Sequence, residues 1–103
     1  MNIVINSQWA KKVLQLDEDF DDDIIEMYLG VANGQVINQT GYDFSKDSDL
    51  DADYVDYVRK SLLMQHYGAD GYNKEYDFTF GMHADLTRLS LRARKLLEVK
   101  DGK

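Results

Sequence analysis

Apolar residues recur at helical spacing over residues 22–40. Their spacing of three or four places them on one side of an α-helix. The stripe consists of Ile25, Tyr28, Leu29, Ala32 and Val36. Asp21 or Asp22 is suited to cap the start of this helix, and Gly41 to end it. A second stripe lies beside the first and consists of Ile24, Met27 and Val31. The helix is therefore expected to carry a wider apolar arc than a surface helix needs.

The same period predicts a helix on each side of this one. The first spans residues 8–16, with Ser7 as a suitable N-cap residue. Its apolar residues are Trp9, Val13 and Leu16. The other begins after Asp51 or Asp53, which are also suitable caps. Its mostly apolar surface is made by Tyr54, Val55, Val58, Leu62, Met64 and Tyr67. Two glycines are expected to end it, Gly68 and Gly71.

The period changes between residues 72 and 80, where aromatic residues alternate with polar ones. This alternation favours a short β segment at 76–80 inside a long aromatic loop. A single strand leaves its backbone unpaired, so it would need a hairpin partner or another chain. A fourth helix is expected from about Met82 to about Leu91. The predicted fold is all-α, a small four-helix bundle with one long aromatic loop.

The chain of 103 residues is expected to form a single domain, because this length buries one modest core. The bundle is predicted to span about 7–95, with a polar loop at 42–51 and a loosely held tail at 96–103. No apolar run approaches the roughly 20 residues of a membrane-spanning helix. The N-terminal segment also lacks the features of a signal peptide. We therefore expect a soluble protein that stays where it is made, with no membrane partner.

Charge is distributed unevenly along a chain whose formal net charge is −7. Residues 1–57 contain 13 Asp and Glu against 3 Lys and Arg, whereas residues 58–103 contain 6 against 9. A chain polarised in this way can attract a second copy of itself, acidic front to basic tail. Two differently solvated ends would give the same pattern, so both interpretations stay open.

The acidic run LDEDFDDDII at residues 16–25 does not have the spacing of a calcium loop. An EF-hand loop starting at Asp17 requires glycine at its sixth position and glutamate at its twelfth. Those positions hold Asp22 and Tyr28. A second acidic run, at 47–53, fails the same test. We expect no specific metal site, and carboxylates that cap a helix and face its dipole.

Catalytic signatures are missing from the sequence. The chain has no cysteine, no Gly-x-Ser-x-Gly elbow and no glycine-rich phosphate loop. His66 and His83 do not form a recognisable ligand pair, and His66 is expected to pack or hydrogen-bond near a helix end. Exposed carboxylates offer no environment that would separate two pKa values for acid–base catalysis. The prediction is therefore no enzyme. Duplex binding by the body of the protein is also not expected, because it requires Lys and Arg.

Two glycines stand four residues apart inside the predicted helix at 22–40. Gly30 and Gly34 therefore share a face. Glycine inside a helix costs roughly 1 kcal/mol relative to alanine. Two on one face suggest that another backbone comes close, as in small-residue helix contacts. That neighbour is either another part of this chain or a second subunit.

The order of these features resembles one known family. The acidic run precedes Ile24 and Ile25, and the helix that follows ends in INQTG. A Tyr-rich helix, DYVRKSLLMQHYG, and a final segment, FGMHADLTRLSLRAR, come next. Over roughly residues 5–95 this is similar to the phage head–tail connector family, small adaptors also labelled DNA-packaging proteins. The chain departs from the family in having Gly81 and Met82 where a proline often precedes the last helix.

The resemblance implies an all-α virion structural protein without enzymatic activity or cofactor. Such a protein assembles as a ring beneath the portal of a tailed-phage capsid, at the head–tail junction. The ring is thought to be dodecameric in the virion. It extends the DNA channel, through which DNA passes without sequence-specific binding, and it docks the next connector or tail protein. Its subunits would be made in the cytoplasm of a bacterial host.

A ring requires two different patches on each subunit that fit one another. The candidate subunit-interface residues are Gly30, Gly34, Tyr76, Phe78, Phe80, Arg92 and Arg94. An alternative function is an acidic DNA mimic, a small phage binding module that inhibits a host nucleic-acid-binding protein. The carboxylates at 17–23 and 47–53 motivate this alternative.

Overall fold

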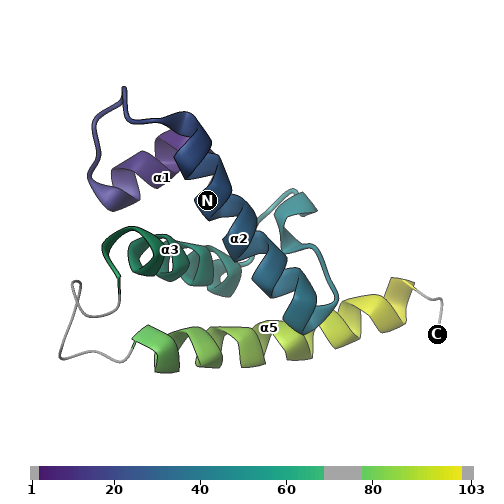
Figure 1. Ribbon diagram of the computed structural model, residues 1–103. Helices are drawn as coiled ribbons and strands as arrows, with labels where there is room; N and C mark the ends of the chain where they lie inside the picture. The colour runs from purple at the N-terminus through teal and green to yellow at the C-terminus, as the bar shows by residue number, and fades with distance from the viewer. Residues whose placement is uncertain (1–2, 69–77, 101–103) are drawn as a thin grey trace.

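A computed structural model describes residues 3–68 and 78–100. Its helices are α1 (Ser7–Leu14), α2 (Asp22–Thr40), α3 (Ala52–Tyr67) and α5 (Phe78–Lys100), with a 3₁₀ turn, η1 (Phe44–Lys46), between α2 and α3 (Figure 1). The fold is 76% helical, and no strand occurs in the described part of the chain. The predicted all-α class and small helical bundle are confirmed.

Acidic and amide side chains start three of the helices. Asn6, Asp21 and Asp51 each accept a hydrogen bond from a backbone N–H two or three residues further on, at 2.8–2.9 Å. These bonds satisfy N–H groups that have no partner inside the helix. The cap of α1 is thus Asn6 and not Ser7, whereas Asp21 and Asp51 are among the residues that the sequence predicted.

Left-handed backbone conformations end the helices. Gly41 and Gly68 follow α2 and α3 with φ angles of 76° and 78°, which glycine adopts without steric cost. Gln15, with φ 58°, ends α1 two residues earlier than predicted. Gly71, also expected to end α3, lies outside the described residues.

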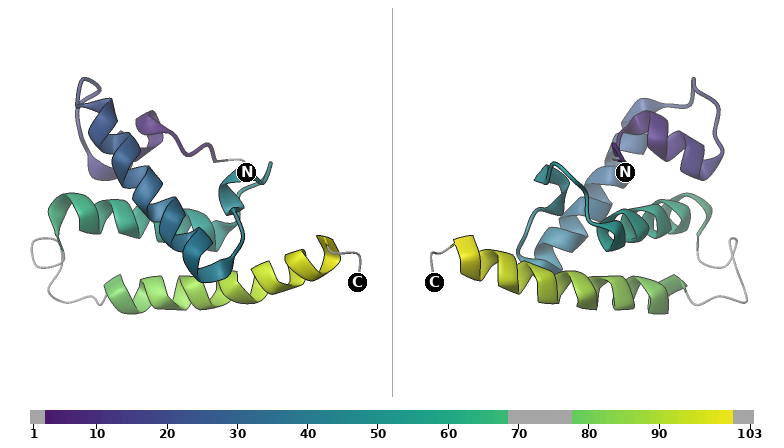
Figure 2. Two further views of the ribbon diagram at one scale, coloured as in Figure 1. Left: turned by 45° about the vertical axis from the view of Figure 1, so that its right-hand side comes forward. Right: turned by 180° about the vertical axis from the view of Figure 1, so that it is seen from behind.

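Helix α3 lies at the centre of the bundle and contacts α1, α2 and α5. Helices α3 and α5 run side by side in opposite directions, and α2 crosses them obliquely, so that its C-terminal end reaches α5 (Figures 1 and 2). The buried apolar core consists of Ala10, Leu14, Ile25, Ala32, Val36, Phe44, Tyr54, Tyr57, Val58, Leu62, Leu63, Leu89 and Ala93. Every element therefore contributes to one core.

The last helix differs from its prediction at both ends. It begins at Phe78, so the β segment expected at 76–80 is wrong for residues 78–80, and Tyr76 lies outside the described residues. It continues to Lys100, where a loose tail was expected from residue 96. Residues 78–80 fit both a short polar–apolar alternation and the spacing of a helix, and they adopt the helix. The apolar positions at that spacing are Phe78, Met82, Leu89 and Ala93.

The segment predicted as a polar loop contains a core residue. Phe44, in η1, is fully buried and packs edge-on against Tyr42, with ring centroids 4.7 Å apart. It also stacks on Tyr54 of α3 at 6.1 Å. Asp43 caps η1 by accepting from the backbone N–H of Ser45 at 3.1 Å. Hydrogen bonds from Ser45, the hydroxyl foremost, lower the pKa of Asp43 against the effect of burial.

The described residues contain neither a candidate membrane-spanning helix nor a candidate metal cluster. None of their helices combines the length and the apolar character that crossing a bilayer requires. They also contain no group of three or more His, Cys, Asp or Glu side chains arranged to hold a metal ion.

Candidate interaction surfaces

The side of α2 that points away from the core is exposed and largely apolar. Met27 is 58% exposed and Val31 is 42% exposed, large fractions for side chains of this type. Gly30, Gly34 and Ile37 are exposed on the same side or at its edge. We call these five residues the α2 face.

Only one of the two predicted apolar stripes of α2 packs inside the bundle. Ile25, Ala32 and Val36 of the first stripe are fully buried. In the second stripe Ile24 is half-buried, whereas Met27 and Val31 are exposed. The apolar arc of α2 is therefore wider than the described residues of its own chain cover.

The α2 face also lacks the charge that usually solvates an exposed helix. From Met27 to Thr40 the sequence contains no charged residue. The three charged residues of α2 stand before this segment: Asp22, Asp23 and Glu26. The face thus combines an uncharged apolar surface with an acidic N-terminal end.

The glycines at 30 and 34 pack against nothing within the described structure. A Cβ atom added to Gly30 or to Gly34 would meet no heavy atom within 4 Å outside its own helix turn. Their low helix propensity, about 1 kcal/mol each relative to alanine, is therefore not offset by close packing against the described residues. None of these residues supplies the close intramolecular neighbour that was one of the two interpretations drawn from the sequence.

A second exposed surface lies on α5. Leu91 is 56% exposed on the side of α5 opposite Leu89 and Ala93, which are fully buried. Arg94 and Lys95, on the same side as Leu91, are also exposed. We call Leu91, Arg94 and Lys95 the α5 face. It is apolar at its centre and basic at its C-terminal end.

Arg92, also predicted as an interface residue, is engaged within the subunit. Its guanidinium forms ion pairs with the carboxylates of Asp51 and Asp53 at the start of α3. The hydrogen bonds that Arg92 donates to Asp51 and then to Asp53 raise the pKa of Arg92. Arg88 joins the cluster, with 3.1 Å between its Nε atom and Asp53. These arginines fasten α5 to the N-terminal end of α3.

Phe78 and Phe80, the two other candidates that the structure reaches, begin α5. Their side chains, like all of Tyr76, are outside the described part of the structure. The α5 face itself was only partly anticipated. Leu91 was taken as a helix end, but its spacing from Leu89 and Ala93 puts it out of phase with the core stripe, and that signal was present in the sequence.

A polar cluster lies between α3 and α5. Asp85 of α5 is fully buried, with 3.3 Å between its Oδ2 atom and Lys60 Nζ, and 2.6 Å between Oδ1 and Arg88. Lys60 also pairs with Asp56 at 2.6 Å. Burial, then a hydrogen bond to Asp56 and the charge of Asp56, raises the pKa of Asp85. Burial also opposes ionisation of Asp56, but hydrogen bonds from Lys60 and Arg59 outweigh it and lower its pKa to about 2.

The acidic runs are used partly inside the fold. In the first run, Asp21 caps α2 and Asp22 pairs with Lys11 at 2.6 Å. In the second, Asp47 accepts a hydrogen bond from Tyr42 at 2.7 Å. That run also supplies both carboxylates that bind Arg92. The second run therefore serves mainly to hold the subunit together.

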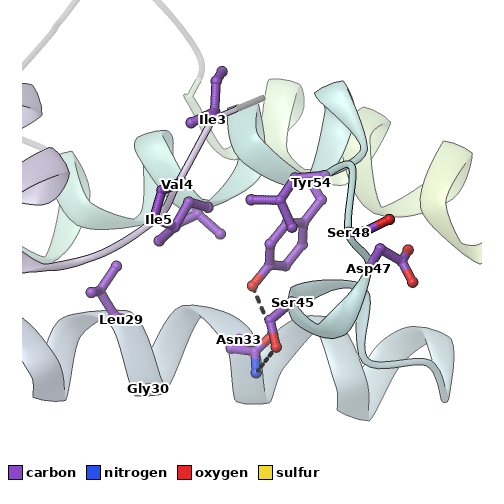
Figure 3. A pocket seen from close by; sticks show the side chains of 12 residues that line it. Ile3, Val4, Ile5, Leu29, Gly30, Asn33, Ser45, Asp47, Ser48 and Tyr54 are labelled. Atoms are coloured by element: carbon purple, nitrogen blue, oxygen red, sulfur yellow. Dashed lines mark hydrogen bonds between the residues drawn. The ribbon is translucent and has the colours of Figure 1, made fainter. Parts of the chain in front are cut away.

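A pocket of about 440 Å³ lies between residues 3–5, the middle of α2, the η1 segment and the start of α3 (Figure 3). Its polar groups bind one another. Tyr54 donates a hydrogen bond to Asn33 at 2.8 Å, and the Asn33 amide reaches Ser45 at 3.5 Å. Burial raises the pKa of Tyr54 to about 12, so its hydroxyl stays protonated at neutral pH. This arrangement rigidifies the pocket but presents no nucleophile paired with a base.

The structure thus offers two exposed surfaces on different helices, one apolar with an acidic end and one apolar with a basic end. No family model, no curated protein and no solved structure matches the chain. The α2 face and the α5 face each combine exposed apolar side chains with a charged end.

Proposed function

We propose that the protein is a structural phage adaptor, which assembles as a ring between the portal and the tail. In this role it extends the DNA channel and docks tail-completion proteins. The proposal includes a ring that matches the symmetry of the portal, with twelve subunits in the virion. Its partners are the portal and the next connector or tail protein. Catalysis and cofactors have no part in it.

The α2 face carries this proposal. Met27, Val31 and Ile37 expose apolar side chains to water, and burial against a second subunit would recover their apolar contribution. A ring requires two different patches on each subunit, and the α2 face and the α5 face are two such patches.

The charge of the chain is compatible with a DNA channel. A net charge of −7 repels the phosphate backbone, so that DNA slides past without being held. Carboxylates of the 17–23 run, among them Asp17 and Asp19, are exposed and available to line such a passage.

Size-exclusion chromatography with light scattering tests the proposal. We expect the average mass to rise with protein concentration, or to rise when the portal protein encoded in the same genome is added. A strict monomer of 11.9 kDa at every concentration, unaltered by the portal protein, would contradict the proposal.

The DNA-mimic alternative is not favoured by a specific contact. It relies on two exposed acidic runs, and the second of them is largely engaged with Arg92, Arg88 and Tyr42. A pull-down that returns a basic host protein, released steeply by salt, would support the mimic over the adaptor.

A further inference from the structure

We infer that the α2 face binds the α5 face of a second copy, with the two helices antiparallel and Leu91 opposite Gly30. This inference rests on the proposed function, because it specifies how one subunit contacts the next. Its partner is a second copy of this chain, which the matching shape and charge of the two faces favour.

The shapes of the two faces correspond. Gly30 and Gly34 leave a shallow notch along α2, bordered by the exposed side chains of Met27 and Val31. On α5, Leu91 projects as a single large apolar side chain from a polar surface. Side chains of one helix pack into grooves of another, and glycines let the two axes approach closely. Leu91 therefore fits over Gly30.

Charge then selects the direction of the helices. Lys95 follows Leu91 by four residues, and Glu26 precedes Gly30 by four, so both lie about 6 Å from the centre of the contact. In antiparallel register Lys95 falls opposite Glu26, whereas in parallel register it falls opposite Gly34. Within the described residues neither Lys95 nor Glu26 has an ion-pair partner.

Neighbouring charges support the same register. Arg94, one position before Lys95, brings a second positive charge toward the acidic end of α2, where Asp23 is exposed. Glu98 lies a further turn along α5, and packed helices that cross at about 20–50° diverge away from their contact point. Glu98 is therefore carried away from Asp23, and the net interaction is attractive.

The geometry has a consequence for assembly. The contact joins different surfaces of two identical subunits, so each subunit keeps one unused α2 face and one unused α5 face after pairing. Such a heterologous contact propagates until it closes into a ring, or else it forms a filament. A face-to-face dimer of α2 with α2 would stop at two subunits.

Disulfide trapping tests the register directly, because the chain has no cysteine of its own. In the inferred register Gly34 lies opposite Thr87, which is exposed on α5, and neither residue forms the centre of the contact. Two single variants, Gly34→Cys and Thr87→Cys, are mixed under oxidised glutathione. Disulfides form only when the Cα atoms approach to about 4.4–6.8 Å, so cross-linking reports close packing.

We expect the mixture to give a covalent dimer at least tenfold faster than either variant alone. The matched control mixes Gly34→Cys with Lys12→Cys, an equally exposed position on α1, and should cross-link slowly. Equal rates in the two mixtures would overturn the inference. Faster cross-linking of Gly34→Cys with itself would also overturn it, in favour of an α2–α2 dimer.

Charge reversal provides a second, independent measurement on the whole chain. Glu26→Lys and Lys95→Glu should each weaken self-association about fivefold, as expected for one exposed ion pair. The double variant should restore it to within about twofold of the wild type. A double variant as weak as the weaker single variant would overturn the pairing. A wild type that associates without either effect would refute this register alone, whereas a wild type that stays monomeric at every concentration, with or without the portal protein, would contradict the proposed function.

Discussion

At the scale of single residues, the buried carboxyl of Asp85 is the strongest departure from a simple apolar core. Lys60 and Arg88 neutralise it, yet burial and the nearby Asp56 still raise its pKa from 3.8. Two carboxyls that share one lysine do not ionise equally, because like charges at short range disfavour the second ionisation. The pair therefore behaves as one acid that is hard to ionise and one that is easy.

This asymmetry predicts how stability depends on pH. The folded-state pKa of Asp85 is raised, so its contribution to stability is present below about pH 4 and is lost as pH rises through the folded pKa. The folded-state pKa of Asp56 is lowered to about 2, so its contribution to stability has the opposite pH dependence. That contribution is lost only as pH falls from about 4 toward 2. Urea denaturation of the wild type and Asp85→Asn at pH 3.5 and pH 7 isolates Asp85. We expect the wild type to lose stability relative to Asp85→Asn across this interval, by at most about 1.4 kcal/mol per pH unit. A difference independent of pH would contradict the raised pKa.

At the scale of elements, carboxylates at helix starts cap their own helix, and one of them also binds a neighbouring helix. Asp21 only caps α2, through the backbone N–H of Asp23 at 2.9 Å. Asp51 caps α3 in the same way and also binds Arg92 of α5. The start of α3 is thus tied both to its own backbone and to the helix beside it.

Removing these two caps should separate the contribution of the capping hydrogen bond to stability from that of the ion pair with Arg92. Asp21→Ala should cost about 1 kcal/mol, the usual value of one cap. Asp51→Ala should cost about 1.5–2 kcal/mol, because it loses a similar cap and part of a half-exposed ion pair, which is worth up to about 1 kcal/mol. Denaturation midpoints at neutral pH give both values. Equal losses would mean that the ion pair with Arg92 adds nothing to stability.

The exposed glycines of α2 give an unusual pair of expectations. Gly30→Ala and Gly34→Ala should each stabilise the monomer by about 0.5–1 kcal/mol, because the added methyl group meets nothing within 4 Å. Each should also weaken self-association by widening the helix contact. Thermal denaturation measures the first effect and light scattering the second. The control Gly41→Ala should destabilise the protein, since its φ of 76° disfavours a side chain.

At the scale of the whole molecule, the sequence predicted the fold class correctly but did not predict that the last helix extends to Lys100. Asp21, Gly41 and Asp51 were identifiable because capping and left-handed turns depend on a few adjacent residues. Phe44 was not, because its burial depends on packing against Tyr54 of α3, and the spacing of apolar residues does not show that contact.

The candidate surfaces were likewise predictable from the sequence only in part. Gly30 and Gly34 were identifiable from their spacing, but only the structure could show that none of the residues it describes packs against them. Arg92 was assigned to an interface from charge alone. Its partners Asp51 and Asp53 come from another helix, so a one-dimensional charge count could not find them.

The exposed apolar surface of the α2 face leads us to expect self-association, and a double substitution tests this expectation. Met27→Gln with Val31→Gln removes the two most exposed apolar side chains of the face while leaving the core intact. Burial of such side chains is worth about 1.5–3 kcal/mol each when complete, so even partial burial predicts at least tenfold weaker self-association.

The monomer should keep its helicity and its denaturation midpoint, because neither side chain is buried within the subunit. Val4→Gln serves as the matched control, since Val4 is also exposed but lies on the N-terminal segment. Analytical ultracentrifugation over a range of concentrations, with circular dichroism on the same samples, measures both properties. If the double variant associates as strongly as the wild type, the α2 face is a solvated surface, and the subunits of any ring must meet elsewhere.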